Sequence, residues 1–395
     1  MNSRTRAIIL SITAPVVAFA VVGGLLGTVL AREDTYQHLK IFDDVVSLIS
    51  SNYVEPVNID KVMRGAMDGL ADSLDPDSAY LSPEEVKQAE SGAPLPAGDP
   101  GIELTRQYYL RILATRDNSP AFKAGLRTGD YVRAIDDLPT RDMNVWEGMR
   151  ALRGAAGSKV TLTIFRANAA DPHVVILTRE AQPPLVVTGR IAAPGVGYLR
   201  VPSIGPGTAE QIKSQVATLT ADGATKLVVD IRRTSNGTYE QGLALARLFV
   251  AKGTLAMREA KGVATRETIA AAPGDGAIVM PAVLLIDNGT SGAAELFASA
   301  VNGNQRADLI GERTIGRAGV QKLIKLPDGS GLWLTTVRYL TPAGKPLHEK
   351  GLEPTVAVDG PEVEFGQPAP VADAALDRAL EYLAKSDRLA EKKAA

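Results

Sequence analysis

The sequence predicts a multidomain protein of mixed α+β and α/β class, with a helical N-terminal segment, a small β-rich module and a larger α/β domain. At 395 residues, the chain is long enough to bury more than one core, which excludes a single small domain. Strand-like runs surround one helix between residues 101 and 180, whereas strand-like and helical runs alternate after residue 184. Such alternation is typical of domains built from β-α-β units.

The composition excludes several function classes. The 43 basic and 45 acidic side chains give a net charge of −2, so the chain lacks the positive field that nucleic-acid binding needs. The absence of cysteine excludes disulfides, thiolate zinc sites and cysteine nucleophiles. The three histidines, His38, His173 and His348, match no metal or catalytic spacing. We therefore expect no metal or organic cofactor, disfavour a Ser-His-Asp site, and place His173 and His348 at the surface or in loops.

Residues 1–35 are predicted to form a cytoplasmic stub and a transmembrane signal anchor. Residues 7–31 contain no charge, and they follow Arg4 and Arg6. This stretch exceeds the roughly 20 residues that span a bilayer and the roughly 7–15 of a signal-peptide core. The positive-inside rule then places the body of the chain outside the cytoplasm, in the periplasm or an equivalent space at the inner membrane. A signal peptide cleaved near Ala31 is the alternative and gives the folded part the same location.

Residues 36–92 are predicted to be mainly helical. Apolar residues recur there at spacings of three and four, which is typical of amphipathic helices. Ser82 followed by Pro83 predicts an N-cap with proline at the first helical position. Residues 91–101 are rich in Gly, Ala and Pro, so we expect a linker and a module boundary there.

Two folded domains are predicted after this boundary. The β-rich module is assigned to residues 95–182, with strands at Leu110–Ala114, Tyr131–Ile135 and Val160–Phe165 and a helix at Val145–Leu152. The α/β domain is assigned to residues 184–360. Its predicted strands are Gly197–Val201, Leu227–Ile231 and Ala282–Ile286, and its predicted helices are Thr208–Leu219, Tyr239–Phe249 and Ala293–Val301.

Residues 361–395 are predicted to contain a terminal helix. Leu376, Ala379, Leu380 and Leu383 form an apolar stripe on one face of such a helix. We expect this stripe to dock on the chain's own domain, with docking on a second copy as the alternative.

Four motifs, in order along the chain, resemble those of the carboxyl-terminal processing peptidases, also called tail-specific proteases. Residues 74–85 read LDPDSAYLSPEE and resemble the family's LDPHSSYLSPEE, and residues 119–130 read SPAFKAGLRTGD and resemble the PDZ signature SPAxKAGLKPGD. Residues 339–344 and 348–354 resemble YYTPSG and HGKGIEPD. The resemblance covers about residues 40–360 and implies a PDZ-like module followed by a ClpP/crotonase-like β-α-β peptidase domain.

The resemblance also implies a serine-lysine dyad, and both of its positions are substituted in this chain. The family motif G-S-A-S-A-S-E aligns with GTSGAAE at residues 289–295, which puts Gly292 at the nucleophile position. The base, a lysine 25 residues later, aligns with Arg317, and Gln321 keeps the supporting glutamine. Glycine has no nucleophilic side chain, and a guanidinium with a pKa above about 12 cannot accept a proton from serine. We therefore predict an impaired enzyme, a pseudopeptidase.

The backbone donors implied by the resemblance are partly retained. The family's N-P-G-G loop, which contributes to the oxyanion hole, aligns with the region around Asn236 and Gly237. Gly237 and Ala293 are the expected oxyanion positions, and Asn236 is expected to tolerate a left-handed backbone. A site of this kind without a nucleophile can still bind a carbonyl or a carboxylate.

The PDZ-like module has a carboxylate-binding loop in the family, and this loop aligns with Gly101, Ile102, Glu103 and Leu104. Glu103 takes the place of a glycine and adds a negative charge where the family binds a peptide carboxylate. Peptide binding by this module therefore stays open beside a structural or interdomain role.

Alternatives also stay open at Ser291 and Arg317. Ser291 is the fallback nucleophile of a displaced dyad with Lys322 or Lys325 as base, but an N-cap role is preferred. For Arg317, an ion pair with a nearby carboxylate is preferred over recognition of a terminal carboxylate through its planar fork. The predicted partners are protein or peptide C-termini, with a homo-oligomer or an active paralogue as further candidates.

Overall fold

The structure, a computed structural model, describes residues 36–166, 171–262, 266–361, 363–367 and 372–394. The predicted signal anchor in residues 1–35 lies outside these ranges. Within them, no helix is long and apolar enough to cross a bilayer. The chain divides into two compact units, residues 1–67 and 68–395, and the PDZ-like module and the α/β domain both lie in the second unit.

The predicted helical segment contains helices at residues 36–52, α2 (Ile59–Asp72) and α3 (Pro83–Glu90). The cap predicted for α3 is confirmed. The Ser82 side chain accepts a hydrogen bond from the Glu85 amide, the Glu85 carboxylate accepts one from the Ser82 amide, and Pro83 is the first helical residue. This reciprocal pair satisfies amides that have no partner inside the helix.

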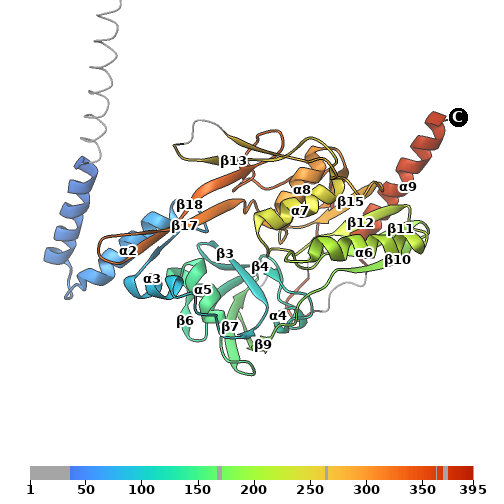
Figure 1. Ribbon diagram of the computed structural model, residues 1–395. Coiled ribbons are helices and arrows are strands. Elements are labelled where there is room, and N and C mark those ends of the chain that lie inside the picture. The colour runs from blue at the N-terminus through green and yellow to red at the C-terminus, as the bar shows by residue number, and fades with distance from the viewer. Residues whose placement is uncertain (1–35, 167–170, 263–265, 362, 368–371, 395) are drawn as a thin grey trace, which may run out of the picture. The chain divides into compact units, whose positions relative to one another are not determined.

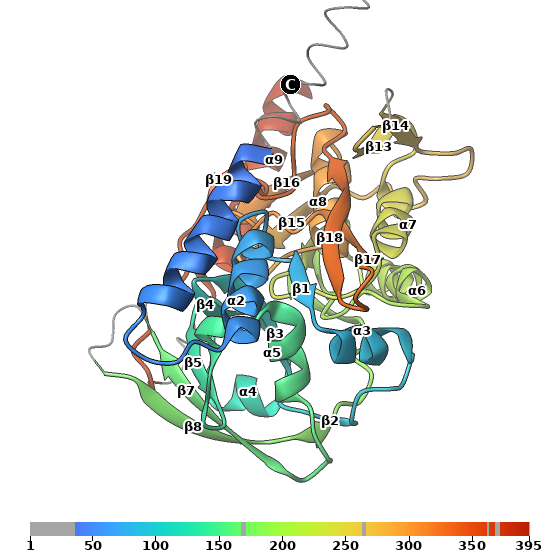
Figure 2. The same ribbon diagram turned by 90° about the vertical axis from the view of Figure 1, so that its left-hand side faces the viewer.

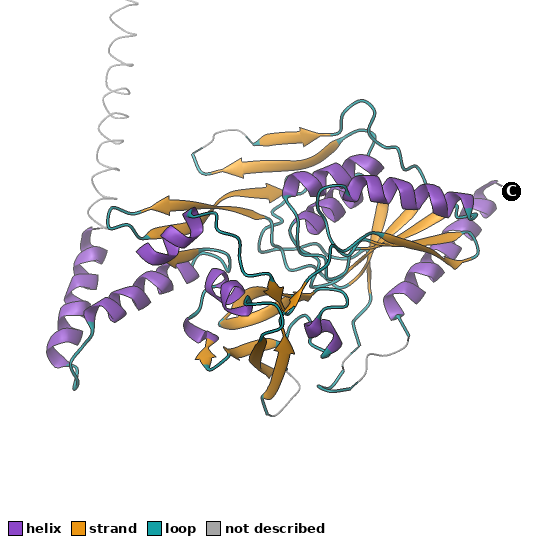
Figure 3. Cartoon of the chain, turned by 60° about the horizontal axis from the view of Figure 1, so that its bottom comes forward, coloured by secondary structure: helices purple, strands orange, loops and turns teal. Residues whose placement is uncertain are grey.

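The PDZ-like module is built on one antiparallel sheet, which Figure 3 draws among the orange strands. Its strands pair in the order β3-β4-β5-β7-β8, with β6 beside β5. They are β3 (Ile102–Gln107), β4 (Tyr109–Thr115), β5 (Tyr131–Ile135), β6 (Leu138–Pro139), β7 (Lys159–Phe165) and β8 (His173–Thr178). The helical turns are α4 (Pro120–Lys123), η1 (Thr140–Asp142) and α5 (Val145–Leu152). The predicted helix at Val145–Leu152 is confirmed, and its Leu152 packs with Leu104, Leu110 and Leu162 in the core of the module.

The segment predicted as a linker is partly folded. Gly98–Asp99 form β2, which pairs with β9 (Glu180–Ala181), so hydrogen bonds join the two ends of the module. Gly101 has φ +82°, and a Cβ there would lie 2.2 Å from the Ser119 Cβ. The turn into β3 therefore requires glycine.

The α/β domain contains a sheet with the strand order β10-β11-β12-β15-β16-β19. Its strands are β10 (Thr188–Ala193), β11 (Val196–Arg200), β12 (Lys226–Asp230), β15 (Ala282–Ile286), β16 (Ala307–Gly311) and β19 (Val356–Ala357). From β11 to β19 all neighbours are parallel, and β10 is an antiparallel edge strand. The prediction of β-α-β units is confirmed. Figure 1 draws the PDZ-like module in cyan and green and this domain in yellow-green to red.

Helices cover both faces of this sheet, and each face has its own core. One face packs on α6 (Thr208–Ala221), α7 (Tyr239–Phe249) and α8 (Ala293–Gly303). The other face packs on α9 (Ala374–Ala394), whose Ala379 and Leu383 contact Val228 and Val283 in one apolar cluster. Figure 2 shows the strands between α9 on one side and α7 and α8 on the other. The predicted docking of the terminal helix on its own domain is confirmed.

A second antiparallel sheet joins distant parts of the chain. It consists of β1 (Ala79–Leu81), β13 (Thr254–Ala260), β14 (Glu267–Ala270), β17 (Gly319–Lys325) and β18 (Gly331–Leu340). Strand β18 pairs with β1, β13 and β17. The pairing of β1 with β18 fixes the preceding turn, residues 73–78, against the α/β domain.

The segment between β19 and α9 returns to the PDZ-like module. The Val363 carbonyl accepts a hydrogen bond from Arg166 at 3.1 Å. The Phe365 ring stacks on His173 with centroids 4.1 Å apart and belongs to the partly buried rim of the module's core. His173 is therefore an interdomain contact on β8, not the loop or surface residue that we predicted. We name residues 363–367 the C-terminal strap.

Candidate functional site

Gly292 lies at the turn between β15 and α8, the place where the resembling family carries its nucleophile. Its backbone has φ +61° and ψ −120°, a conformation that is strained for residues with a side chain. A Cβ there would nevertheless meet nothing closer than the Ser235 carbonyl oxygen at 3.7 Å. The position has room for a side chain and carries none.

The structure brings the two predicted dyad positions together. The Gly292 amide donates a hydrogen bond of 3.1 Å to the Arg317 carbonyl oxygen. Glu295, in the first turn of α8, holds the same loop, because its carboxylate accepts hydrogen bonds from the Thr314 hydroxyl and from the amides of Gly316 (2.9 Å) and Arg317 (2.8 Å). Burial raises the pKa of Glu295 to about 7.

The Arg317 side chain forms an ion pair, as preferred from the sequence. One guanidinium nitrogen lies 2.9 Å from Oδ1 of Asp77, whose side chain is only 6% exposed. Burial opposes the charged form of Arg317, but the charges of Asp77 and Glu103 outweigh it and raise the Arg317 pKa above its ordinary value. Arg317 therefore stays protonated and cannot act as a general base.

A cavity of about 300 Å³ opens beside Arg317. Its walls come from the turn before β1, from β3 and β4 of the PDZ-like module, and from the loops around residues 315 and 348. Arg317, Asp77, Arg106, Arg111 and His348 are among its lining residues. A neighbouring cavity of about 490 Å³ shares Arg106 and Glu349 with it. Elements of the PDZ-like module and of the α/β domain thus line one open cavity beside the base position, with several charged side chains on its walls.

His348 lies in a turn, as predicted, but its side chain packs against two neighbouring segments. Its side chain is 9% exposed, Nδ1 accepts a hydrogen bond from the Ala318 amide at 3.3 Å, and Nε2 lies 4.0 Å from Oδ2 of Asp75. Asp75 in turn accepts a hydrogen bond from the Ser78 hydroxyl at 3.0 Å. The resembling motifs at residues 74–85 and 348–354 are therefore in contact and together support the loop that carries Arg317.

Ser291 does not cap α8, so the preferred interpretation of this residue is wrong. Gly292 occupies the cap position, and Ser291 is fully buried with no hydrogen-bond partner for Oγ in the described part of the chain. Of the two candidate bases, Lys325 pairs with Glu90 at 2.9 Å and Lys322 is exposed on β17. Among the described residues, no lysine lies within hydrogen-bonding distance of Ser291 Oγ.

The loop after β12 is tightly packed against the segment around Ile204. Gly237 has φ +100°, and a Cβ there would lie 2.6 Å from the Ile204 carbonyl oxygen. Asn236 donates a hydrogen bond to the Ser203 hydroxyl at 2.6 Å and accepts one from the Ile204 amide at 3.2 Å. Within this loop Arg233 and Gly237 have positive φ and Asn236 does not, so the tolerance of asparagine for a left-handed backbone is not used there. Asn236 instead fixes the loop through its side chain.

The Gln321 side chain bonds within the second sheet. Gln321 donates hydrogen bonds of 3.1 Å to the Gly319 carbonyl and to the Thr335 hydroxyl, both within the second sheet. It makes no hydrogen bond to the Arg317 side chain among the interactions of the described residues. Gln321 therefore stabilises the β17–β18 pairing.

The carboxylate loop of the PDZ-like module is surrounded by acids. The Gly101 amide already donates a hydrogen bond of 2.7 Å to Asp99, which pairs with Arg153 at 2.8 Å. Burial raises the pKa of Glu103, and Arg317 acts against this shift. Ile102 and Leu104 point into the module's core, with 2% and 0% exposure. The loop thus offers a terminal carboxylate two neighbouring acidic side chains and one amide that is already occupied.

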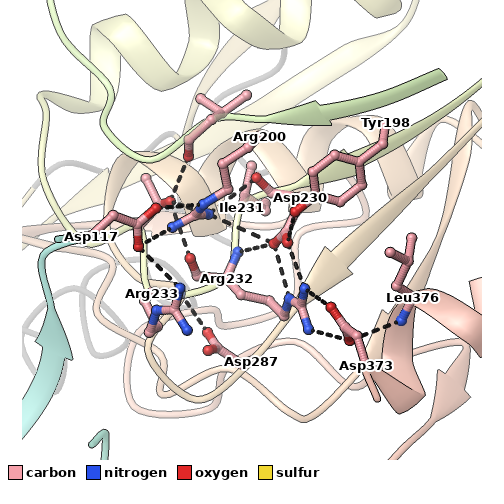
Figure 4. Close-up of polar contacts among 12 residues, drawn as sticks. Asp117, Tyr198, Arg200, Asp230, Ile231, Arg232, Arg233, Asp287, Asp373 and Leu376 are labelled. Atoms are coloured by element: carbon pink, nitrogen blue, oxygen red, sulfur yellow. Dashed lines mark hydrogen bonds and ion pairs between the residues drawn. The ribbon is translucent and has the colours of Figure 1, made fainter. Parts of the chain in front are cut away.

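A partly buried ionic cluster joins the PDZ-like module to the α/β domain (Figure 4). Asp117, in the turn after β4, accepts hydrogen bonds from Arg200 at 2.9 and 3.1 Å and from Arg233 at 3.0 Å. Arg232 links Asp230 and Asp373 with contacts of 2.6 and 2.7 Å. We name these six residues the interdomain cluster.

Sequence reasoning missed Asp77, Glu295 and the interdomain cluster. Glu295 carried a signal, since it ends the motif that locates Gly292. Asp77 also lies inside a family motif, but nothing in the sequence indicates its contact with Arg317. Among the described residues no group of acids or histidines is arranged to hold a metal ion.

Comparison with known proteins agrees with this architecture. The sequence profile of peptidase family S41 matches residues 195–358, and that of the PDZ domain matches residues 111–166. The carboxy-terminal-processing protease of Bartonella bacilliformis is 28% identical over 335 residues, which cover 84% of this chain and 77% of that protein. The carboxyl-terminal-processing protease of Synechocystis is 29% identical over 358 residues, with coverages of 87% and 82%.

A solved structure of a photosystem II D1 C-terminal processing protease shares the fold. It superposes with a TM-score of 0.67 at 27% sequence identity and covers 78% of this chain and 84% of that one. The predicted fold class, a mixed α and β protein with a PDZ domain and a peptidase domain, is confirmed. Residues 195–358 therefore belong to peptidase family S41, and the chain as a whole is similar to carboxyl-terminal processing peptidases over more than four fifths of its length.

Proposed function

We propose that this chain is a non-catalytic member of its family, anchored in the inner membrane with its body outside the cytoplasm, that binds protein C-termini or partner subunits. The observation that carries the proposal is Gly292, a nucleophile position without a nucleophile. Arg317 at the base position adds to it, because a guanidinium paired with Asp77 has no site for the serine proton.

The arrangement around Arg317 supports binding of a peptide carboxylate in the cleft. Arg317 is 28% exposed and lines the 300 Å³ cavity, and only Asp77 pairs with its side chain among the described residues. The planar fork of arginine suits a carboxylate, and charge-assisted hydrogen bonds are the stronger kind. The acids at the PDZ-like loop, Asp99 and Glu103, disfavour that loop as the carboxylate site. We therefore place the tail carboxylate at Arg317.

Cleavage is tested with residues 33–395 and an unstructured protein substrate that ends in apolar residues. We expect no cleavage by the wild type. Cleavage by the wild type that Ser291→Ala abolishes would overturn the proposal and make the displaced nucleophile the correct reading.

Tail binding is tested by titrating a labelled peptide with a free C-terminus against the same peptide with an amidated C-terminus. We expect the free acid to bind at least about tenfold more tightly, because a charge-assisted hydrogen bond contributes roughly 1.5–3 kcal/mol. Arg317→Gln should remove this difference, whereas Arg258→Gln, at an exposed position of β13, should preserve it. Equal binding of both peptides by the wild type would refute a carboxylate site.

Membrane anchoring and partner binding are tested with the full chain. We expect carbonate-resistant membrane association of the full chain, accessibility of its body to protease added from outside, and loss of membrane association for residues 33–395. Co-purification from the native membrane distinguishes a bound paralogue or a second copy from a chain that acts alone. Release of the full chain by carbonate would argue against an anchor.

A further inference from the structure

A buried carboxylate lies against the position that the family uses for its base. Asp77 lies in the turn before β1, its side chain is 6% exposed, and Oδ1 lies 2.9 Å from the Arg317 guanidinium. Apart from this ion pair, Oδ1 has no hydrogen-bond partner among the described residues. A buried carboxylate oxygen with no other partner is stabilised by a cation beside it, and for Oδ1 of Asp77 that cation is the side chain at position 317.

We propose that Asp77 is a second, independent block to catalysis, because it would hold any basic side chain at position 317 in its protonated form. Replacing Arg317 by lysine would then supply the family's residue but not a working base. This inference rests on the proposed function and extends it from two substituted positions to three. Asp77 is a positioning residue, since it acts through its neighbour.

Charged and titratable groups face position 317 from several elements. Asp77 comes from the turn before β1, Glu103 from β3, Tyr239 from α7, and Glu295 contacts the backbone of Arg317 from α8. Asp77 and Glu103 both favour a cation at this position. The remaining lining residues that bear charge or titrate are Arg106, Arg111, His348 and Glu349. Arg106 and Arg111 oppose a cation, but Asp77 is the group in direct contact with it.

The family mechanism needs a neutral amine at this position. As the serine oxygen bonds to the carbonyl carbon of the substrate, the hydroxyl proton passes to the lysine nitrogen, which must have a free electron pair. An opposite charge in contact shifts a pKa by about 1–3 units toward the charged form. With Asp77 present, the fraction of neutral amine at a given pH should therefore fall by about 10- to 1,000-fold.

The first experiment measures the lysine itself and does not depend on catalysis. The full chain in detergent carries Arg317→Lys alone or Arg317→Lys with Asp77→Asn, and its lysines are reductively methylated with isotope-labelled formaldehyde for NMR titration. The signal absent from the wild type reports position 317. We expect its titration midpoint to lie about 1–3 pH units lower with Asp77→Asn. Asp275→Asn, which removes a comparable carboxylate from Arg247 at 2.7 Å, should leave the midpoint unchanged.

The second experiment measures cleavage and labelling by a fluorophosphonate probe. Gly292→Ser with Arg317→Lys should be silent or active only at high pH, and adding Asp77→Asn should move the rate profile to lower pH by the same 1–3 units. Equal midpoints and equal pH profiles with and without Asp77 would overturn the inference. Cleavage by the wild type would instead overturn the proposed function, and the NMR midpoints would still decide the role of Asp77.

Discussion

Removal of Asp117 should loosen the contact between the PDZ-like module and the α/β domain. Its carboxylate accepts three hydrogen bonds from Arg200 and Arg233, and its side chain is 19% exposed. Truncating one partner of a buried ion pair costs about 3–5 kcal/mol. Arg200 keeps a second carboxylate, Asp230, at 3.7 Å, so we expect Asp117→Asn to lower the free energy of unfolding by about 2–3 kcal/mol.

The loss of stability in Asp117→Asn should depend on pH. Burial opposes the charged form of Asp117, but the hydrogen bonds and charges of Arg200 and Arg233 outweigh it and lower the pKa of this carboxyl. A lowered pKa in the folded state means that the ion pair stabilises the fold above the unfolded pKa and that this stabilisation disappears as pH falls through the folded pKa. The difference between wild type and Asp117→Asn should thus be constant near neutral pH and shrink below about pH 4.

Urea denaturation at pH 7 and at pH 3 measures this difference, and hydrogen exchange of the Arg116–Asn118 amides reports local opening. Glu267→Gln, which breaks the exposed pair with Arg258, is the control and should cost less than about 1 kcal/mol. If Asp117→Asn lowers the free energy of unfolding no more than this control does, the interdomain cluster shown in Figure 4 does not hold the two domains together.

Three further predictions concern stability. Gly292→Ser should lower the free energy of unfolding by about 1–3 kcal/mol, since φ +61° is strained for serine, whereas an unchanged value would show that the turn relaxes. Burial raises the pKa of Glu295 from 4.5 to about 7. The free energy of unfolding should therefore fall by up to about 3 kcal/mol as pH rises from about 4.5 to 7. In denaturation curves measured across this range, Glu295→Gln should remove the pH dependence. Leu383→Ala should lower the free energy of unfolding by about 2–5 kcal/mol, because it opens a cavity under α9. The control Glu381→Ala, on the exposed side of the same helix, should lower it by less than about 0.5 kcal/mol. Equal losses for the two variants would contradict the docking of α9.

Local elements of this fold could be predicted because their residues carry the signal themselves. Strand β15 is a run of five apolar residues, Ala282–Ile286, and all five are buried in the parallel sheet. The helix at Val145–Leu152 starts with Asn144 and Glu147, which form a capping box. The stripe on α9 follows from the helical period alone. In each case a window of about ten residues contains the physical cause.

The site was predictable only as far as the family motifs reach. They locate Gly292 and Arg317, whose backbone contact the structure then shows. They do not reveal that Asp77 pairs with Arg317, because 240 positions separate the two residues and the pairing of β1 with β18 brings them together. For Ser291, the motifs did not predict the first residue of α8 correctly. The helix is capped by Gly292, one residue later than expected, so Ser291 is not the N-cap. The sequence therefore did not predict contacts between distant residues or the exact residue at which a helix begins.

The C-terminal strap also bears on the order in which the protein is made. The PDZ-like module is complete in sequence by Ala181, yet Phe365 of the strap caps its core rim and stacks on His173. At roughly 5–20 residues per second, a ribosome needs about 10–40 s to add the intervening stretch. During that time the nascent module exposes the surface that Phe365 later covers. A chaperone or translocation factor that shields this surface during synthesis would act before the last helix emerges.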